Sequence, residues 1–126
     1  MKKIITTEGA PAAIGPYSQA VQAGDFLFAS GQIALDPKTG QMAAGGVGEQ
    51  TKRALDNAKA VVEGAGFTMQ QVVRTTVFVA AIEDFSLING IYAEYFKENP
   101  PARSLVAVKD LPKGALVEVE LIAWKG

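Results

Sequence analysis

The alternation of apolar and polar residues along the chain predicts six strands and two helices. Strands are expected where β-branched and aromatic residues cluster or alternate with polar ones, over residues 3–7, 18–23, 26–29, 72–80, 104–108 and 117–124. Helices are expected over 49–63 and 85–98, where apolar residues recur every three to four positions. The order β-β-β-α-β-α-β-β predicts an α+β fold with one mixed sheet and both helices on a single face. Residues 1–126 are expected to form one domain.

Glycines and polar residues mark the ends of these elements. Gly24-Asp25 predicts the turn of a hairpin between the second and third strands. The segment Gly45-Gly46-Val47-Gly48 lacks the lysine and serine of a phosphate-binding P-loop, so it predicts the entry to the first helix. Asp84 is expected to cap the second helix.

The predicted sheet has more apolar surface than two helices can cover. The strands over 72–80, 104–108 and 117–124 are apolar on both faces, and both helices are expected on the same face. The other face must therefore be buried against something, and no second domain is predicted. Another copy of the same chain is the economical solution, so we expect a homo-oligomer with sites at the junctions between subunits.

Arg103 lies at the start of a strand that is expected to be largely buried on both faces, directly after Pro100-Pro101 and Ala102. A guanidinium cannot lose its proton and is rarely buried without a partner, so it needs a carboxylate. The local sequence favours a structural acid, Glu118 or Glu120. The alternative is a carboxylate that a ligand supplies, which the planar fork of arginine can bind through two hydrogen bonds.

The last strand separates into two faces. One face is wholly apolar and consists of Val117, Val119, Leu121 and Ala123. The other face combines two acids with two large apolar side chains, in the order Glu118, Glu120, Ile122 and Trp124. Acids beside apolar side chains suggest a half-buried face on which a carboxylate could act as a base. The alternative is a solvated outer face. Trp124 is expected to belong to an interface core rather than to a ligand platform.

The composition removes several classes of chemistry. The chain has no histidine and no cysteine, which excludes a Ser-His-Asp triad, a cysteine nucleophile, disulfides and N/S-ligated zinc or copper sites. Oxygen-ligated metal sites stay possible, but no acids stand at calcium-loop spacing, and no metal site is expected. With a net charge of −1 and no basic run, nucleic-acid binding is not expected. No apolar stretch is long enough to cross a membrane, and a cytoplasmic location is expected.

Four motifs together resemble the RidA (YjgF) family of reactive-intermediate deaminases. They are Ala-Ile-Gly-Pro-Tyr-Ser-Gln-Ala (13–20), Phe-Ala-Ser-Gly-Gln-Ile (28–33), Pro-Ala-Arg-Ser (101–104) and Glu-Val-Glu (118–120). The resemblance implies a chorismate-mutase-like α+β fold and a homotrimer with ligand clefts between subunits. It also implies a cofactor-independent hydrolysis of enamine and imine acids, such as 2-aminoacrylate and 2-iminobutanoate, to 2-keto acids and ammonia.

The same resemblance implies roles for individual residues. Arg103 would bind the substrate carboxylate, and Glu118 would orient or deprotonate the attacking water. Tyr17 would form a wall of the pocket or offer its hydroxyl. The remaining lining residues would be Ser30, Gly31 and Asn89.

Leu105 stands where some family members have a cysteine, which disfavours any thiol-dependent role. Two other functions stay open from the sequence. One is a non-catalytic module that binds or senses small carboxylates through Arg103. The other is a ribonuclease or translation-inhibiting activity, which the missing histidine and the missing basic patch disfavour.

Overall fold

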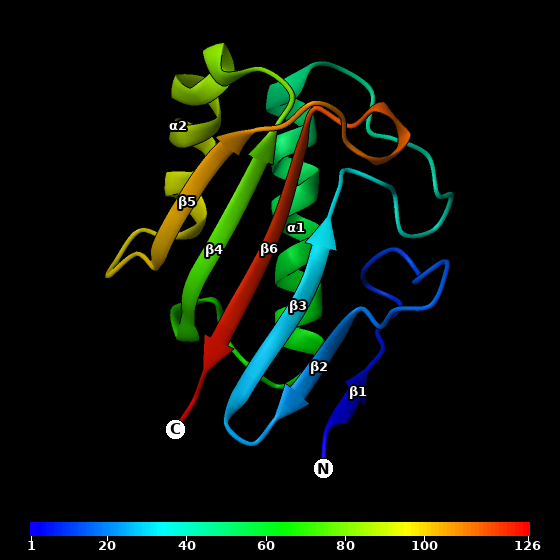
Figure 1. The fold of residues 1–126 in the computed structure, drawn as a ribbon, viewed down its shortest axis with the longest axis vertical. Helices are drawn as coiled ribbons and strands as arrows, with labels where there is room; N and C mark the ends of the chain where they lie inside the picture. The colour runs from blue at the N-terminus through cyan, green and yellow to red at the C-terminus, as the bar shows by residue number, and fades with distance from the viewer.

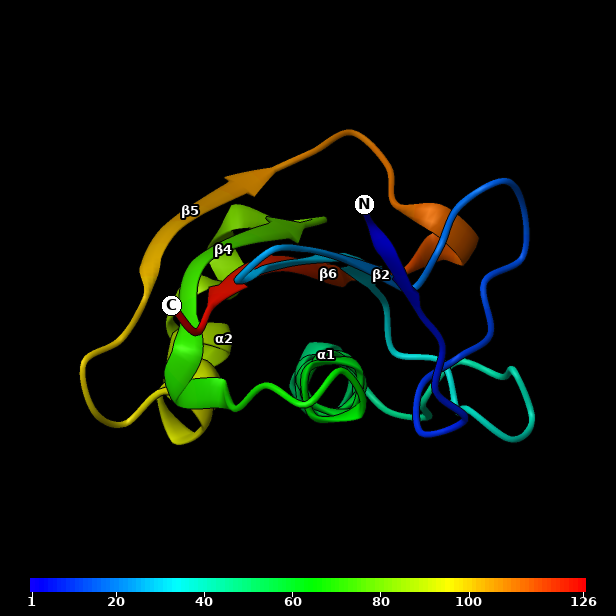
Figure 2. The ribbon, with the colours of Figure 1, turned by 90° about the horizontal axis from the view of Figure 1, so that it is seen from below.

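The computed structural model describes residues 1–126 as a six-stranded mixed sheet with two helices packed on one face (Figure 1; Figure 2). The strands are β1 Lys3–Ile5, β2 Ala20–Ala23, β3 Phe26–Gln32, β4 Val72–Val79, β5 Ala102–Ala107 and β6 Val117–Trp124. The helices are α1 Val47–Gly64 and α2 Phe85–Tyr95, and three single 3₁₀ turns lie at Met69–Gln71, Ile82–Asp84 and Pro112–Gly114. The predicted fold class and order of elements are confirmed.

The strands are arranged in the order β1-β2-β3-β6-β4-β5, so the last strand of the sequence lies in the middle of the sheet. Neighbouring strands are antiparallel except β4 and β5, which α2 connects in parallel. β5 is therefore an edge strand, and the prediction that it is largely buried on both faces is wrong. Ala102 and Val106 point to the face of the sheet that carries no helix and are exposed, and Ala107 is exposed at the end of the strand.

The hydrophobic core lies between the sheet and α1. The apolar face predicted for the first helix is buried as expected, and it consists of Thr51, Ala54, Leu55, Ala58, Val61 and Val62. The predicted two faces of the last strand are also confirmed, because Val117, Val119, Leu121 and Ala123 are at most 3% exposed. Strand β6 thus directs one row of side chains into the core and presents the other row on the opposite face of the sheet.

The ends of the helices agree with the sequence only in part. Helix α1 begins at Val47, before the predicted start at residue 49, so Val47 and Gly48 of the predicted entry lie inside the helix. Asp84 immediately precedes α2 but makes no capping hydrogen bond through its side chain, so the predicted cap is wrong. The chain enters α2 through a 3₁₀ turn, and Asp84 lacks the extended backbone of a typical N-cap residue. The helix ends at Tyr95 instead of residue 98, because the backbone of Phe96 leaves the helical region.

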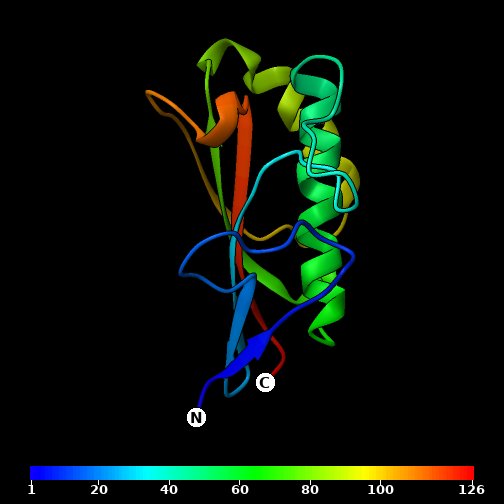
Figure 3. The ribbon, with the colours of Figure 1, turned by 90° about the vertical axis from the view of Figure 1, so that its right-hand side faces the viewer.

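Neither α1 nor α2 covers the second face of the sheet, as Figure 3 shows. Large apolar side chains stand exposed on it, among them Phe28 and Trp124, which are 46% and 47% exposed. The rings of Phe26 and Phe28 lie 6.2 Å apart on this face. The face is therefore the kind of surface on which the expected oligomer depends. Neither helix has the length and hydrophobicity that a membrane-spanning segment needs.

Candidate active site

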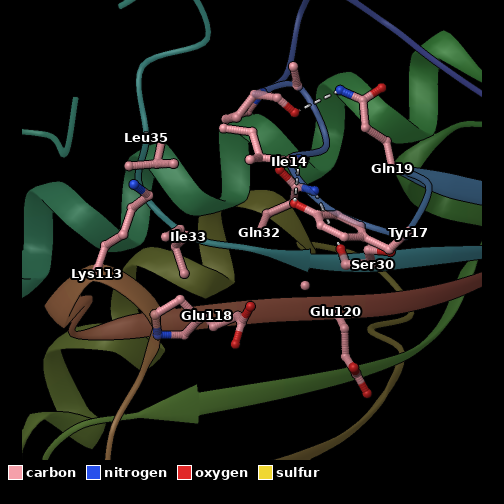
Figure 4. A pocket seen from close by; sticks show the side chains of 14 residues that line it. Ile14, Tyr17, Gln19, Ser30, Gln32, Ile33, Leu35, Lys113, Glu118 and Glu120 are labelled. Carbon is pink, nitrogen blue, oxygen red and sulfur yellow. Dashed lines mark hydrogen bonds between the residues drawn. The ribbon is translucent and has the colours of Figure 1, made fainter. Parts of the chain in front are cut away.

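A cavity of about 620 Å³ lies where β3 and β6 meet the loops above them (Figure 4). The loop between β1 and β2 contributes Pro11, Ala12, Ile14, Tyr17 and Gln19 to its walls. The end of β3 and the following segment contribute Ser30, Gly31, Gln32, Ile33 and Leu35, and the last part of the chain contributes Pro112, Lys113, Glu118 and Glu120. Four of the residues predicted for the site therefore line one cavity: Tyr17, Ser30, Gly31 and Glu118.

Ser30 and Gly31 lie in an irregular part of β3. Ala29 pairs with Leu121 and Gln32 pairs with Val119, so two residues of β3 oppose the single residue Glu120 of β6. Such a bulge redirects side chains and is frequent beside functional sites. The sequence predicted that the third strand ends at residue 29, and the bulge instead carries the strand on to Gln32.

Gly31 leaves the space that the Glu118 carboxyl group occupies. A Cβ atom added to Gly31 would lie 2.5 Å from one carboxylate oxygen of Glu118 and 2.8 Å from its carboxyl carbon. Any side chain at this position would displace the acid. The glycine is therefore required for close approach between the backbone of β3 and the Glu118 side chain.

Burial raises the pKa of Glu118, and the negative charge of Glu120 raises it further. Glu118 is half-buried on the floor of the cavity, whereas Glu120 is exposed and in Figure 4 points away from Tyr17 and Ser30. A carboxylic acid whose pKa moves toward neutrality becomes a better base when ionised and can return a proton more readily. The electrostatics of the cavity thus suit proton transfer.

Two hydroxyl groups face the same cavity from above β6. Ser30 Oγ donates a hydrogen bond to the backbone oxygen of Ser18 at 2.6 Å. The Tyr17 hydroxyl accepts a long hydrogen bond from the backbone N–H of Ile14, at 3.4 Å, and the Tyr17 side chain is 53% exposed. The cavity therefore offers a carboxyl group and two hydroxyl groups within one enclosure.

Arg103 does not line this cavity. It pairs with Thr75 across β4 and β5, and Thr75 is fully buried on the helix side, with its hydroxyl 2.7 Å from that of Tyr92. Arg103 therefore points to the helix side of the sheet, whereas Glu118 points to the other side and two strands away. The predicted structural pairing of Arg103 with Glu118 or Glu120 within the chain is wrong, because the sheet separates them.

The Arg103 guanidinium packs against aromatic rings of α2. Its Cζ atom is 4.7 Å from the ring centre of Tyr92 and 5.7 Å from that of Phe85. Contacts of this kind use the flat face of the guanidinium and leave the N–H groups at its edge free. No side-chain hydrogen bond within the chain involves Arg103, whereas the neighbouring Ser104 accepts one from Arg74. The edge of the guanidinium is thus open to an acceptor from outside the chain.

Asn89 does not line the cavity that contains Glu118, and it lies on α2, the helix against which Arg103 packs. It follows Phe85 by four residues and precedes Tyr92 by three, so it shares their face of α2, and it is exposed. The six predicted site residues are therefore divided between two places. Within the described chain, no group of three or more histidine, cysteine, aspartate or glutamate side chains is placed to hold a metal ion.

Comparison with known proteins identifies the family. The family model described as Endoribonuclease L-PSP matches residues 7–125. The chain belongs to this family. The resemblance to RidA (YjgF) proteins is thereby confirmed, and with it the expected fold class.

Relatives of this L-PSP family member match over nearly their whole length. The RutC family protein of Pyrococcus horikoshii is 50% identical over 99% of each chain. The human 2-iminobutanoate/2-iminopropanoate deaminase is 47% identical over 100% of this chain and 92% of that protein. The crystal structure of Escherichia coli TdcF with bound serine has a TM-score of 0.94 and 42% identity, and the match covers 98% of this chain and 99% of that one.

Three buried amide side chains hold the walls of the cavity, and sequence reasoning did not assign them to the site. Gln19 accepts a hydrogen bond from the N–H of Thr7 at 2.7 Å and donates to the backbone oxygen of Pro11 at 2.8 Å. These bonds shape the loop that carries Tyr17. Gln19 is only 3% exposed, so breaking its hydrogen bonds would leave buried polar groups without partners.

The other two amides project from α1. Asn57 donates to the backbone oxygens of Ile33 and Leu35, at 3.0 and 2.9 Å, and so holds the segment after β3. Gln50 accepts from the N–H of Leu116 at 2.9 Å, just before β6. A signal was present in the sequence: both amides fall at helical spacing within the apolar face of α1, where an unpaired polar side chain would be costly.

Proposed function

We propose that the chain is a cofactor-independent hydrolase that deaminates 2-imino and 2-enamino acids, such as 2-iminobutanoate and 2-aminoacrylate, to 2-keto acids and ammonia. The observation that carries this proposal is the half-buried Glu118 carboxyl, seated against Gly31 in a cavity, with its pKa raised. The name of the human relative, 2-iminobutanoate/2-iminopropanoate deaminase, supports the same reaction. The cytoplasmic location stays a prediction.

The proposed site forms between two copies of the chain. Arg103 of one copy would meet Glu118, Tyr17 and Ser30 of the next, because within one chain the sheet separates the guanidinium from the carboxyl group. The uncovered apolar face of the sheet, with Phe28 and Trp124 exposed, supports the association of copies. The proposed assembly is the homotrimer that the family resemblance implies.

In the proposed reaction Arg103 binds the substrate carboxylate through two hydrogen bonds and so fixes the position of C2. The reacting species is the iminium form, which an imine reaches by protonation at nitrogen and an enamine by protonation from solvent at C3. Water attacks C2 of the iminium while the Glu118 carboxylate accepts one of its protons, and the resulting neutral intermediate carries a hydroxyl and an amino group on C2. The Glu118 carboxyl then returns the proton to nitrogen, the C2–N bond breaks, and the departing ammonia takes the hydroxyl proton as the keto group forms. The sum is iminium plus water to keto acid plus ammonium, with Glu118 unchanged. Positioning of this kind lowers a barrier by several kcal/mol, up to roughly 7–11 in ideal cases.

A non-catalytic module that binds small carboxylates is the second candidate. It is favoured by one observation, the serine bound in the crystal structure of the TdcF relative. A binder would hold 2-amino or 2-keto acids with an affinity that depends on Arg103, but it would not accelerate hydrolysis. The ribonuclease activity that the family's name states fits less well, because the chain has no histidine and a net charge of −1. Failure to bind or cleave RNA at any salt concentration would dismiss that activity.

The decisive experiment generates 2-aminoacrylate in situ with a serine/threonine dehydratase and follows the keto acid. We expect the wild-type chain to accelerate its appearance, and both Arg103→Ala and Glu118→Gln to lose the acceleration. If the wild-type rate equals the uncatalysed rate while keto acids still bind, the chain is the non-catalytic module.

Co-expression of the two variants tests where the site is. In mixed oligomers a chain with intact Arg103 can meet a chain with intact Glu118, so activity should return. Each purified variant alone is the control. If the mixed oligomers stay as inactive as the single variants, the proposed site between copies is wrong.

A further inference from the structure

The hydroxyl proton of Ser30 is already used in a hydrogen bond within the chain. Its Oγ atom lies 2.6 Å from the backbone oxygen of Ser18, and a carbonyl oxygen can only accept, so Ser30 must be the donor. A hydroxyl group has one proton and two lone pairs. Once the proton is used, Ser30 presents only lone pairs to the cavity that it lines.

The backbone holds this arrangement in place. The N–H of Ser30 donates to the backbone oxygen of Gln19 at 2.9 Å, so Ser30 is bound through both its N–H and its hydroxyl to the adjacent residues 18 and 19. The buried Gln19 side chain fixes this part of the loop in turn, through its bonds to Thr7 and Pro11. Rotation of the Ser30 hydroxyl toward the cavity would break a short bond and leave the Ser18 oxygen without that donor.

The Tyr17 hydroxyl has the opposite hydrogen-bonding role, because its proton is free to be donated. Its oxygen accepts the N–H of Ile14, at 3.4 Å, so the phenolic proton is not used in that bond and can be donated into the cavity. Tyr17 and Ser30 both line the cavity, above β6 in the view of Figure 4. The cavity therefore combines a hydroxyl that accepts with a second hydroxyl that can donate.

We propose that Ser30 Oγ binds the nitrogen-bearing side of the ligand and thereby distinguishes the substrate from its product. An imine, an enamine or an amino acid carries N–H groups that can donate to Ser30. A keto acid carries at the same position an oxygen that can only accept a hydrogen bond, and Ser30 has no free proton to donate to it. The polarity of Ser30 would thus orient the substrate nitrogen and favour release of the keto acid after hydrolysis.

This assignment rests on the proposed function for the identity of the substrate, but binding alone can test it. L-alanine and pyruvate share one carbon skeleton and differ at C2, where alanine carries an ammonium group and pyruvate a keto oxygen. Isothermal titration of the assembled wild-type protein should show tighter binding of alanine. Ser30→Ala should weaken alanine by about 10- to 100-fold, the range for one hydrogen bond to a charged group, and leave pyruvate unchanged or tighter.

Two variants control for an indirect effect. Ser18→Ala keeps the backbone oxygen that takes the Ser30 proton, so it should keep the preference for alanine. Ser30→Thr keeps a hydroxyl group and should also keep that preference. The proposal is overturned if Ser30→Ala weakens both ligands equally, since Ser30 would then only hold the loop, or if the wild-type protein prefers pyruvate. Turnover of 2-aminoacrylate is measured separately, so an inactive protein that prefers alanine would refute the proposed function and not this assignment.

Discussion

The proposed site has two halves, which the chain builds in different ways. One is the cavity that contains Glu118, and the other is the part of the edge strand β5 that carries Arg103. In the cavity, the buried amides of Gln19, Asn57 and Gln50 each bind the backbone of a different wall segment. At the edge, Arg103 rests on two rings of α2 and makes no side-chain hydrogen bond. The cavity is thus organised before any ligand arrives, whereas the N–H groups of the guanidinium have no side-chain partner within the chain.

This difference shows which half the chain itself organises. Buried hydrogen bonds position Tyr17 and Ser30 within a single chain, and Gly31 makes room for Glu118. No comparable contact fixes the donors of Arg103. Substitutions in the cavity should therefore act on its geometry or its protonation, while substitutions of Arg103 should act on the binding of a carboxylate.

The largest effect is expected from Arg103→Ala. Loss of two charge-assisted hydrogen bonds, at roughly 1.5–3 kcal/mol each, should lower kcat/KM for 2-aminoacrylate by about 10²- to 10⁴-fold. Arg103→Lys keeps the charge but not the fork, so its loss should be smaller but still evident. The measurement is the coupled keto-acid assay, with circular dichroism to verify folding. A loss below about tenfold for Arg103→Ala would contradict the two charge-assisted hydrogen bonds assigned to this residue.

Asn57→Ala should have the next largest effect, and it should appear in stability. Asn57 is 1% exposed, and its removal would leave the backbone oxygen of Leu35 without its donor. The oxygen of Ile33 would lose one of two donors, since the N–H of Leu35 also binds it at 2.9 Å. A buried acceptor left alone costs about 1–3 kcal/mol and the second lost hydrogen bond about 0.5–1.5 kcal/mol, so we expect a loss of about 2–4 kcal/mol in the free energy of unfolding. Urea denaturation measures it. The adjacent Asp56→Ala removes only an exposed hydrogen bond to Tyr95 and should cost less than about 1 kcal/mol. Equal losses for the two variants would contradict the special role of the buried amide.

Gly31→Ala should lower kcat by about tenfold or more, because displacement of a catalytic group by about 1 Å can cost roughly 10²-fold. The added methyl group would overlap the position of the Glu118 carboxylate. The matched control is Gly46→Ala, since no atom lies within 4 Å of the added Cβ there and Gly46 lies outside the cavity. Steady-state kinetics of both variants are the measurement. Full activity of Gly31→Ala would show that the acid need not occupy this position.

Glu120→Gln should have the smallest effect, a shift of the acidic limb of the pH profile. Burial is the larger cause of the raised pKa of Glu118 and the charge of Glu120 the smaller one, so removal of that charge should lower this pKa. Glu118 must be ionised to accept a proton from water, and activity is therefore lost as the pH falls through its pKa. In Glu120→Gln the loss should occur at lower pH than in the wild-type protein. A profile of kcat/KM against pH decides this, and a shift to higher pH would contradict the assigned cause.

Several features of the fold and the site could be predicted from local patterns. The spacing of apolar residues was sufficient to place both helices and the two faces of β6, because burial repeats with the period of the element. The residue types around Glu118 suggested a half-buried acid. The bulge at Ser30 and Gly31 could not be predicted, since it depends on how β3 pairs with β6, a strand nearly a hundred residues away.

The sequence by itself determined the order of the elements and the surplus of apolar surface on the sheet. These features follow from periodicity and from the chemistry of single residues. Only the tertiary structure decided that β6 lies in the middle of the sheet and β5 at its edge, so that Arg103 and Glu118 lie on opposite faces. The physical reason is that strand order arises from pairing between distant segments, which no local pattern specifies.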